Sequence, residues 1–194
     1  MPRILKAIII AVALCFILSL CGFAQNCDDI RHSVLRLHIL ANSDSADDQA
    51  LKLTVRDAIL NAADGLFANA QDATQADAIA EANLPALQQL AQQTVYDNGY
   101  VYAVKAELVN MYFTTRTYDD EATLPAGMYY ALRITIGSGA GHNWWCVAFP
   151  SLCLGASSKK LDDVLTPQQD TIVEQPQKYV VKLKIVEIFS KIFG

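Results

Sequence analysis

The chain has 194 residues, of which 53% are hydrophobic and 18% are charged, and its formal net charge is −5. An acidic balance argues against nucleic acid as a partner, because binding to phosphates requires clustered Lys and Arg. The length suffices for one domain with a hydrophobic core, and no internal repeat indicates a solenoid.

The first 24 residues have the pattern of an export signal. Arg3 and Lys6 give a positive start, the run from Ile8 to Leu20 is apolar apart from one serine, and Gly22 and Ala24 supply small residues. We predict a signal peptide over residues 1–24, cleavage after Ala24 and a secreted protein. The alternative is an uncleaved leader that anchors the chain, because the apolar run approaches the roughly 17 residues of a spanning helix.

The next region predicts one strand followed by helices. The strand covers Val34 to Leu40, where residues alternate between two faces. Ser45 is placed to cap a helix whose apolar stripe runs from Leu51 to Leu66. Two more helices are expected, over residues 74–81 and 84–95, because Pro85 is tolerated in a first helical turn.

Three further strands are predicted, over residues 100–113, 128–136 and 144–149. A polar turn at residues 118–121 precedes the second of them, and the glycine-rich residues 137–141 form a hairpin turn before the third. This order predicts an α+β fold, with an antiparallel sheet of about four strands, helices packed on one face and a C-terminal amphipathic helix. We expect a signalling domain over residues 25–165, a linker over 166–180 and the amphipathic helix over 181–194.

Few residues are candidates for catalysis. The glycine-rich loop lacks the Gly-Lys-Ser/Thr ending of a phosphate loop, and a strand rather than a helix follows it. The three histidines, His32, His38 and His142, have no metal-ligand spacing, so neither a metal nor a cofactor is predicted. The enzymatic alternative is an exported thiol hydrolase with Cys146 as nucleophile and His38 or His142 as base.

Two cysteines, Cys146 and Cys153, flank the sequence VAFPSL. A turn at Pro150 would bring them to the separation that a disulfide needs, and export exposes a protein to an oxidising environment. The alternative is a pair of buried thiols. Cys27 lies near the predicted new N-terminus, either free or paired between chains.

Candidate partner-binding residues fall in three segments: the end of the first strand, the start of the last strand and the apolar arc of the tail helix. They are His38, Asn42, Asp44, Asp48, Gln49, Trp144, Trp145, Ile188, Phe189 and Phe193. Helix capping is an alternative role for Asp44. The tail helix either folds back on the domain, fits a groove of a protein partner or contacts the membrane surface. A protein groove is favoured over lipid because the polar face has only two lysines beside a glutamate.

Two segments carry a family resemblance. They are RLHILANSDSADDQALKLTVRDAIL, from Arg36 to Leu60, and PAGMYYALRITIGSGAGHNWWCVAFPSLC, from Pro125 to Cys153. Together they resemble the stage II sporulation protein R family of endospore-forming bacteria over about residues 34–153, whereas the tail after Leu154 matches less distinctively. The resemblance implies a protein that is made in the forespore and exported into the space between forespore and mother cell. There it would activate a membrane-embedded aspartic-type protease, the sigma-E factor processing peptidase, without being an enzyme itself.

Overall fold

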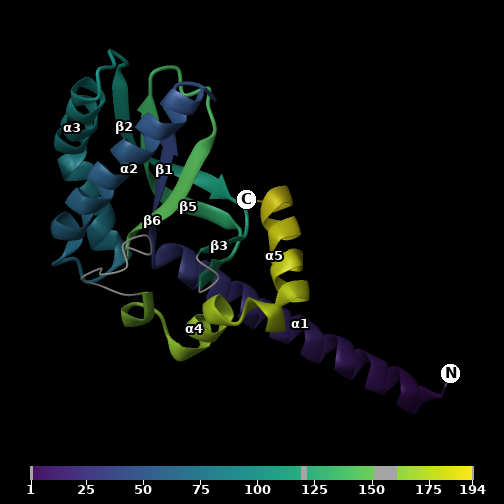
Figure 1. Cartoon of the computed structure of the whole chain (residues 1–194). Coiled ribbons are helices and arrows are strands. Elements are labelled where there is room, and N and C mark those ends of the chain that lie inside the picture. Colours follow the sequence, from purple (N-terminus) through teal and green to yellow (C-terminus); the bar gives the residue numbers. More distant parts are fainter. Residues whose placement is uncertain (1, 119–121, 151–160, 194) are drawn as a thin grey trace. The chain divides into compact units, whose positions relative to one another are not determined.

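The computed structural model describes residues 2–118, 122–150 and 161–193. These residues form two compact units, which we treat separately (Figure 1). The sheet unit comprises His32–Phe113 and Met128–Thr166, and the helical unit comprises Met1–Arg31, Thr114–Gly127 and Pro167–Gly194.

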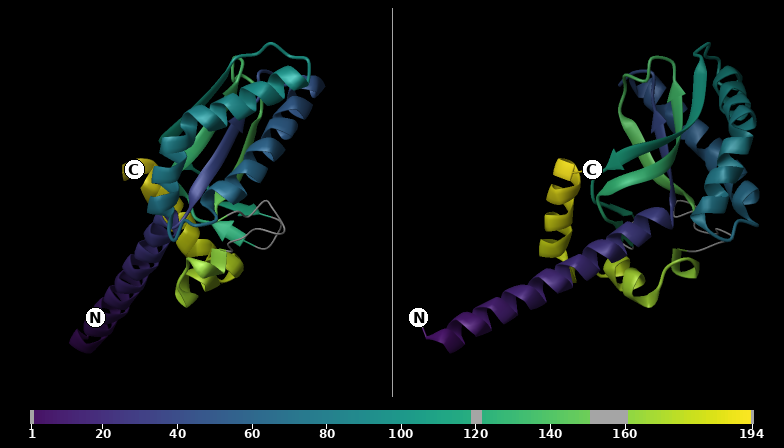
Figure 2. Two further views of the ribbon diagram at one scale, coloured as in Figure 1. Left: turned by 90° about the vertical axis from the view of Figure 1, so that its left-hand side faces the viewer. Right: turned by 180° about the vertical axis from the view of Figure 1, so that it is seen from behind.

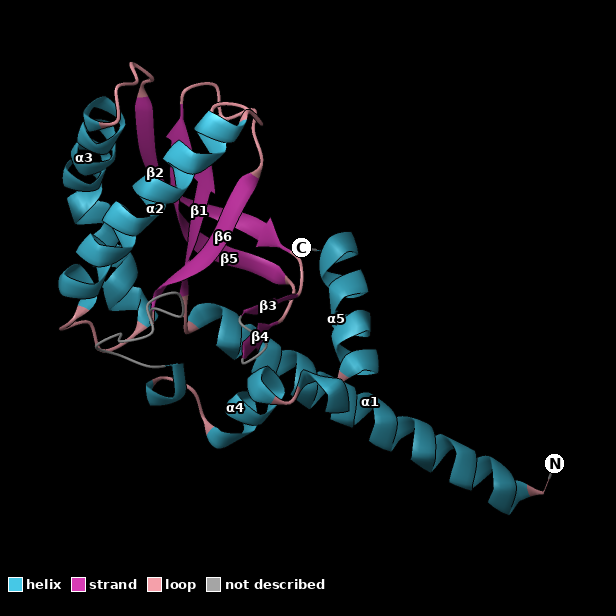
Figure 3. Ribbon diagram, in the orientation of Figure 1, coloured by secondary structure: helices cyan, strands magenta, loops and turns pink. Residues whose placement is uncertain are grey.

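A four-stranded sheet in the order β2-β5-β1-β6 forms the centre of the sheet unit. Two long helices, α2 and α3, pack on one of its faces, as Figure 3 shows. The elements are β1 (Leu35–Leu40), α2 (Ala46–Phe67), α3 (Ala73–Asp97), β2 (Val104–Phe113), β5 (Gly127–Ile136), β6 (Asn143–Phe149) and the short 3-10 turn Leu161–Asp163. The α+β class, the four strands and the helices on one face are confirmed.

The sheet is mixed, whereas the sequence predicted an antiparallel one. β1 pairs parallel with β5, where Leu37 faces Leu132, and antiparallel with β6, where Leu37 faces Cys146. The predicted hairpin between β5 and β6 is therefore wrong, because β1 lies between these strands. β1 occupies a central position in the sheet. Nearly all of its residues are therefore buried, including those on the face away from the helices.

The core lies between the sheet and the two helices. Alternate residues of each strand point into it, as the period of two requires. Its members include Leu37, Ile39, Val55, Ile59, Leu132, Ile134 and Cys146, all of them fully buried. The opposite face of β1 presents Arg36 and His38 instead.

Helix α2 begins as predicted. Ser45 is extended and its hydroxyl accepts a hydrogen bond from the backbone N–H of Asp48, which is the geometry of an N-cap. The two helices expected on either side of Pro85 are instead one helix, α3, with Pro85 inside it. Alanines 76 and 80 before the proline and Leu87 after it are all buried along α3, so tertiary packing on both sides holds it continuous.

The helical unit contains α1 (Arg3–His32, whose last residue begins the sheet unit), the antiparallel pair β3 (Arg116–Tyr118) and β4 (Ala122–Leu124), α4 (Pro167–Glu174), the 3-10 turn Pro176–Lys178 and α5 (Val180–Phe193). Figure 2 shows these elements from two further sides. The C-terminal helix matches the prediction. Residues 167–174, expected within a linker, form α4, whose Ile172 and Val173 are buried.

Helix α1 extends well beyond the apolar leader. Among the described residues it is the one helix that is long and apolar enough to cross a membrane, a property that a signal sequence shares. Phe23, Cys27 and Ile30 are buried, whereas the residues before Phe23 are largely exposed. The C-terminal part of α1 is thus packed like a core helix and the N-terminal part is not.

Candidate functional site

Two loops of the sheet unit meet at one end of the sheet. Residues 41–45 follow β1, and residues 137–142 connect β5 to β6 by crossing the end of β1. Gly141 N donates to Ala41 O at 3.0 Å, and Ala140 N donates to Asn42 O at 3.3 Å. A Cβ on Gly141 would lie 2.1 Å from Ser43 O, so the crossing requires a glycine there. We call the resulting cluster the crossover site: Asn42, Ser43, Asp44, Asp48, Gln49, Lys52, Ser138 and His142.

Asn42 links both loops to helix α2. Its side-chain oxygen accepts a hydrogen bond from Ser138 N at 3.0 Å, and its amide nitrogen donates to Asp48 at 2.9 Å. The Ser138 hydroxyl donates to the backbone carbonyl of Asn42 at 2.6 Å. One side chain therefore fixes the position of the glycine-rich loop relative to the start of the helix.

Asp48 is a buried carboxylate in the first turn of α2. It accepts hydrogen bonds from Ser43 Oγ at 2.5 Å and from Asn42, and these bonds lower the pKa of Asp48 below its usual value. Hydrogen bonds to the ionised form and the nearby helix N-terminus both favour the charge. Asp48 is therefore an ionised structural anchor of the crossover site.

Lys52 lies one turn further along α2 and is also buried. Its ammonium donates to Gln49 Oε1 at 2.6 Å and to the backbone carbonyl of His142 at 2.9 Å. Gln49 in turn donates to Ser43 O at 2.8 Å, and burial lowers the pKa of Lys52. This chain of bonds is a second link, besides Asn42, between the β5–β6 loop and the helix.

The exposed part of the crossover site is the pair Asp44 and His142. Their side chains are 54% and 78% exposed. His142 N donates to Asp44 Oδ1 at 2.6 Å, and the imidazole Nδ1 contacts the same carboxylate. Part-buried hydrogen bonds thus hold the two loops that carry an exposed acid and an exposed imidazole, where another molecule can reach them.

The two tryptophans lie on opposite faces of β6, as strand alternation requires. Trp144 packs against the core beside α2, with the Arg56 guanidinium 4.4 Å from the ring centroid. Trp145 stacks on the His38 ring at 3.9 Å and meets the Phe113 ring edge-on at 4.9 Å. Both indoles are partly buried.

His38 and Arg36 lie on the sheet face away from the helices. Arg36 is fully buried, with its guanidinium carbon 4.3 Å from the Phe113 ring and 4.8 Å from the Tyr129 ring. Burial lowers the pKa of His38 to about 4, so its ring is neutral at physiological pH. His38 supports Trp145 from beneath and offers little surface of its own.

The structure brings together most of the residues that the sequence singled out. Asn42, Asp44, Asp48 and Gln49 all belong to the crossover site. Lys52, Ser138 and His142 were missed as partner-binding candidates, although the short distance in sequence from the glycine-rich loop to His142 was a usable signal. In the helical unit Ile188 and Phe189 are exposed on α5, and the Phe193 side chain lies outside the described part.

Cys146 is fully buried on the helix-facing side of β6, opposite Leu37. His38 follows Leu37 and therefore points to the other side of the sheet. His142 lies four positions earlier in the chain than Cys146, about 13 Å along an extended strand. This geometry does not favour a hydrolase built on Cys146. Cys153 lies outside the described residues, so its disulfide with Cys146 stays a prediction.

The crossover site is thus a polar surface at one end of an α+β sheet, where rigid elements hold exposed loop residues in position. A sequence profile of Stage II sporulation protein R matches residues 31–159. The chain is 33% identical over 147 residues to Stage II sporulation protein R of Bacillus subtilis (strain 168). That alignment covers 73% of this chain and 65% of the relative, less than two thirds of its length.

The chain belongs to the stage II sporulation protein R family, which gives it a role in sporulation and confirms the resemblance. The matched residues 31–159 include both loops of the crossover site. No solved structure matches the chain.

Proposed function

We propose that this chain is an exported sporulation signal that activates a membrane-embedded aspartic-type protease, the sigma-E factor processing peptidase, by direct contact. Membership of the stage II sporulation protein R family supports the sporulation role. The protease and its sigma precursor are proposed as partners because the family resemblance implies them. The site of action is the space between forespore and mother cell.

The observation that carries the proposal is the construction of the crossover site. Asp44 and His142 are exposed, whereas Asp48 and Lys52 behind them are buried and hydrogen-bonded. A surface that is already ordered loses little conformational entropy when a partner binds. The exposed pair is therefore the preferred contact with the protease.

Activation in this scheme is a shift of population. The chain must bind the active conformation of the protease more tightly than the inactive one, because equal affinity for both would change nothing. An acidic group beside an imidazole offers both an acceptor and a donor to the partner. Loss of either group is expected to weaken binding to the active conformation.

The test is reconstitution in a non-sporulating host that expresses this chain, the protease and the sigma precursor. Asp44→Ala and His142→Ala should each reduce precursor cleavage at least tenfold. Glu81→Ala is the matched control, since it removes an exposed carboxylate from α3 far along the sequence from the site. Secretion of each variant is checked by the amount of chain recovered outside the cytoplasm, and folding by its circular dichroism spectrum.

Three outcomes would overturn the proposal. Cleavage that occurs without this chain would remove the need for a signal. No cleavage with the folded parent chain would exclude activation. Equal cleavage with Asp44→Ala, His142→Ala and Glu81→Ala would move the contact away from the crossover site.

A further inference from the structure

The predicted cleavage point lies inside a helix that has buried residues both before and after that point. Helix α1 runs without a break from Arg3 to His32, through Ala24. Phe23 is buried just before that point, and Cys27 and Ile30 are fully buried after it. Cleavage after Ala24 would therefore remove a core residue of the helical unit along with the leader.

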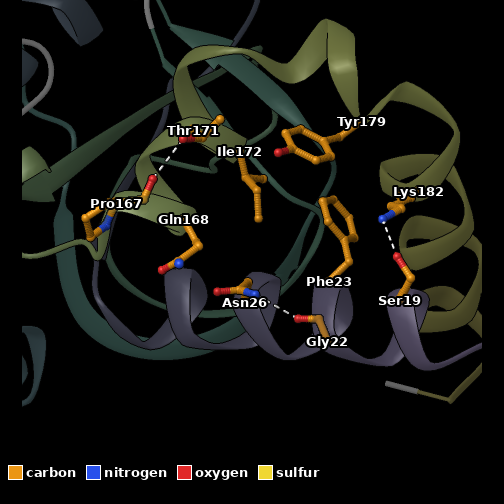
Figure 4. Close-up of a pocket in the computed structure, with 10 residues that line it drawn as sticks. All are labelled: Ser19, Gly22, Phe23, Asn26, Pro167, Gln168, Thr171, Ile172, Tyr179 and Lys182. Carbon is orange, nitrogen blue, oxygen red and sulfur yellow. Dashed lines mark hydrogen bonds between the residues drawn. The ribbon is translucent and has the colours of Figure 1, made fainter. Parts of the chain in front are cut away.

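Phe23 packs against residues of the C-terminal segment. Its ring stacks on Tyr179 at 5.3 Å, and the Lys182 ammonium lies 5.5 Å from the ring centroid. Lys182 also donates to Ser19 Oγ at 2.9 Å. Figure 4 shows these side chains around a cavity of about 500 Å³, to which α4 contributes Thr171 and Ile172. The last turns of the leader are thus a structural partner of α4 and α5.

The earlier part of α1 has the opposite character. Its large apolar side chains are exposed, and they include Ile4, Ile8, Ile10, Val12, Leu14, Phe16 and Leu18. A helical stretch of 18 residues spans about 27 Å at 1.5 Å per residue, close to the roughly 30 Å of a bilayer core. Arg3 and Lys6 stand at its start, on the side that the positive-inside rule keeps in the cytoplasm.

Helix α5 packs against α1 with only part of its apolar surface. Leu183 and Val186 are buried. An adjoining strip remains exposed, formed by Val181 (69%), Ile188 (49%), Phe189 (58%) and Ile192 (65%). The charged stripe lies on another side, where Glu187 pairs with Lys184 and Lys191, each at 3.1 Å.

The position of α5 along α1 indicates what covers this strip. A groove between the two helices is lined by Ile17, Leu20, Cys21 and Ala24 of α1 and by Ile185, Val186 and Phe189 of α5, among others. These α1 residues form the end of the apolar stretch. Figures 1 and 2 show α5 crossing α1 steeply. If α1 crosses a bilayer, α5 therefore lies along the surface of that bilayer.

We infer that α1 is retained as a membrane anchor and that α5 lies beside it in the outer interface of the bilayer, with Val181, Ile188 and Ile192 in contact with lipid. The small charge of α5 is no obstacle, because the anchor already holds α5 at the membrane and supplies a high effective concentration. An amphipathic helix then binds through its buried apolar area. This inference concerns how the protein is held and does not depend on activation of a protease.

The first experiment follows the leader. The full chain is expressed in a Gram-positive host, membranes are washed with alkaline carbonate, and the intact mass of the chain is measured. Retention predicts the full 21.2 kDa in the washed membranes. A chain that begins at Gln25 would overturn the inference.

The second experiment follows α5 in the full chain, reconstituted in phosphatidylcholine vesicles with or without brominated acyl chains. Ile188→Trp adds a fluorophore on the exposed apolar strip, and Val180→Trp adds one at a 62% exposed position of the same helix, about 80° around its axis from Ile188. Brominated lipid should quench the added emission of Ile188→Trp at least threefold more strongly.

Equal quenching of Ile188→Trp and Val180→Trp would overturn the interfacial position of α5. A second result would also overturn it. If brominated lipid does not quench Ile188→Trp, but added protease protects this tryptophan from a soluble quencher, the apolar strip binds a groove of the protein partner.

Discussion

The two units of this protein are built on opposite principles. In the sheet unit the distinctive residues are polar, buried and hydrogen-bonded, and Asp48 and Lys52 are the clearest cases. In the helical unit the distinctive residues are apolar and exposed, on α1 and on one side of α5. The first arrangement needs particular residues at particular positions, whereas the second needs only apolar character over a sufficient length.

The family profile follows the same division. It matches residues 31–159, which leaves out nearly all of α1 and all of α4 and α5. A membrane anchor, as we infer α1 to be, can change its residues freely as long as it stays apolar. Replacement of one residue in the crossover site, by contrast, leaves a buried partner unsatisfied. Substitutions should therefore be costly in the first unit and mild on the exposed surfaces of the second.

The largest effect is expected at Gly141. A Cβ on this residue would lie 2.1 Å from Ser43 O, so Gly141→Ala must displace backbone. We expect a loss of about 2–3 kcal/mol in the free energy of unfolding, measured by urea denaturation. Gly65→Ala is the control, because nothing lies within 4 Å of the new atom. It should be neutral or stabilise α2 by up to about 1 kcal/mol, and equal effects of both variants would refute the role of the crossing.

Asp48 should show the next largest effect. Asp48→Ala leaves Asn42 and Ser43 without their acceptor, and the expected loss is about 2 kcal/mol at pH 7. Because hydrogen bonds lower the pKa of Asp48, its contribution is present above the ordinary pKa near 3.9 and disappears as the pH falls below it. Urea denaturation of parent and variant should therefore converge at low pH. A constant difference from pH 7 to pH 2 would contradict this account.

A smaller effect of opposite sign is expected at Asp77 on α3. Burial, and then the charge of Asp72, raise the pKa of Asp77 to about 6, and Asp77 Oδ1 has no hydrogen-bond partner among the described residues. Because its pKa is raised, the contribution of Asp77 to the free energy of unfolding is most favourable below pH 4 and is lost as the pH rises through 6. Asp77→Asn should stabilise the sheet unit by about 1 kcal/mol at pH 8 and have little effect at pH 4.

Thermal unfolding at the two pH values measures this difference. Glu81→Gln, at an exposed position of the same helix, should change stability by less than about 0.5 kcal/mol at both. Destabilisation by Asp77→Asn at pH 8 would show that the carboxylate is stabilised by a partner.

The sequence predicted the local elements well and their partners poorly. Ser45 as an N-cap and the strand from Val34 to Leu40 follow from residue type and period, which are local properties. The parallel pairing of β1 with β5 depends on a contact between residues almost a hundred positions apart. A period of two does not encode which strand lies beside which. The hairpin between β5 and β6 was therefore predicted from their short connecting loop, and it was wrong.

The same limit applies to the site. Asn42, Asp44, Asp48 and Gln49 were found because they gather in one short segment. Lys52 was not among the candidates from the sequence, and only the fold reveals that its ammonium donates a hydrogen bond to the carbonyl of His142 and that the residue is buried. Long side chains are hard to place from sequence, because their stems and their charged ends prefer different surroundings.

The smallest effects on stability are expected at two exposed apolar residues, one in each unit. Val101 in the sheet unit and Ile192 on α5 are 88% and 65% exposed. Replacement of either by Gln should change the free energy of unfolding by less than about 0.5 kcal/mol. The two should differ in vesicles, where lipid contact at Ile192 shields the preceding residue, Lys191, from trypsin. We expect Ile192→Gln to raise tryptic cleavage at Lys191 severalfold in vesicles and not in detergent, while Val101→Gln has no effect in either. Equal cleavage rates for the two variants in vesicles would mean that the apolar strip of α5 has no lipid partner and that the two units differ in composition alone.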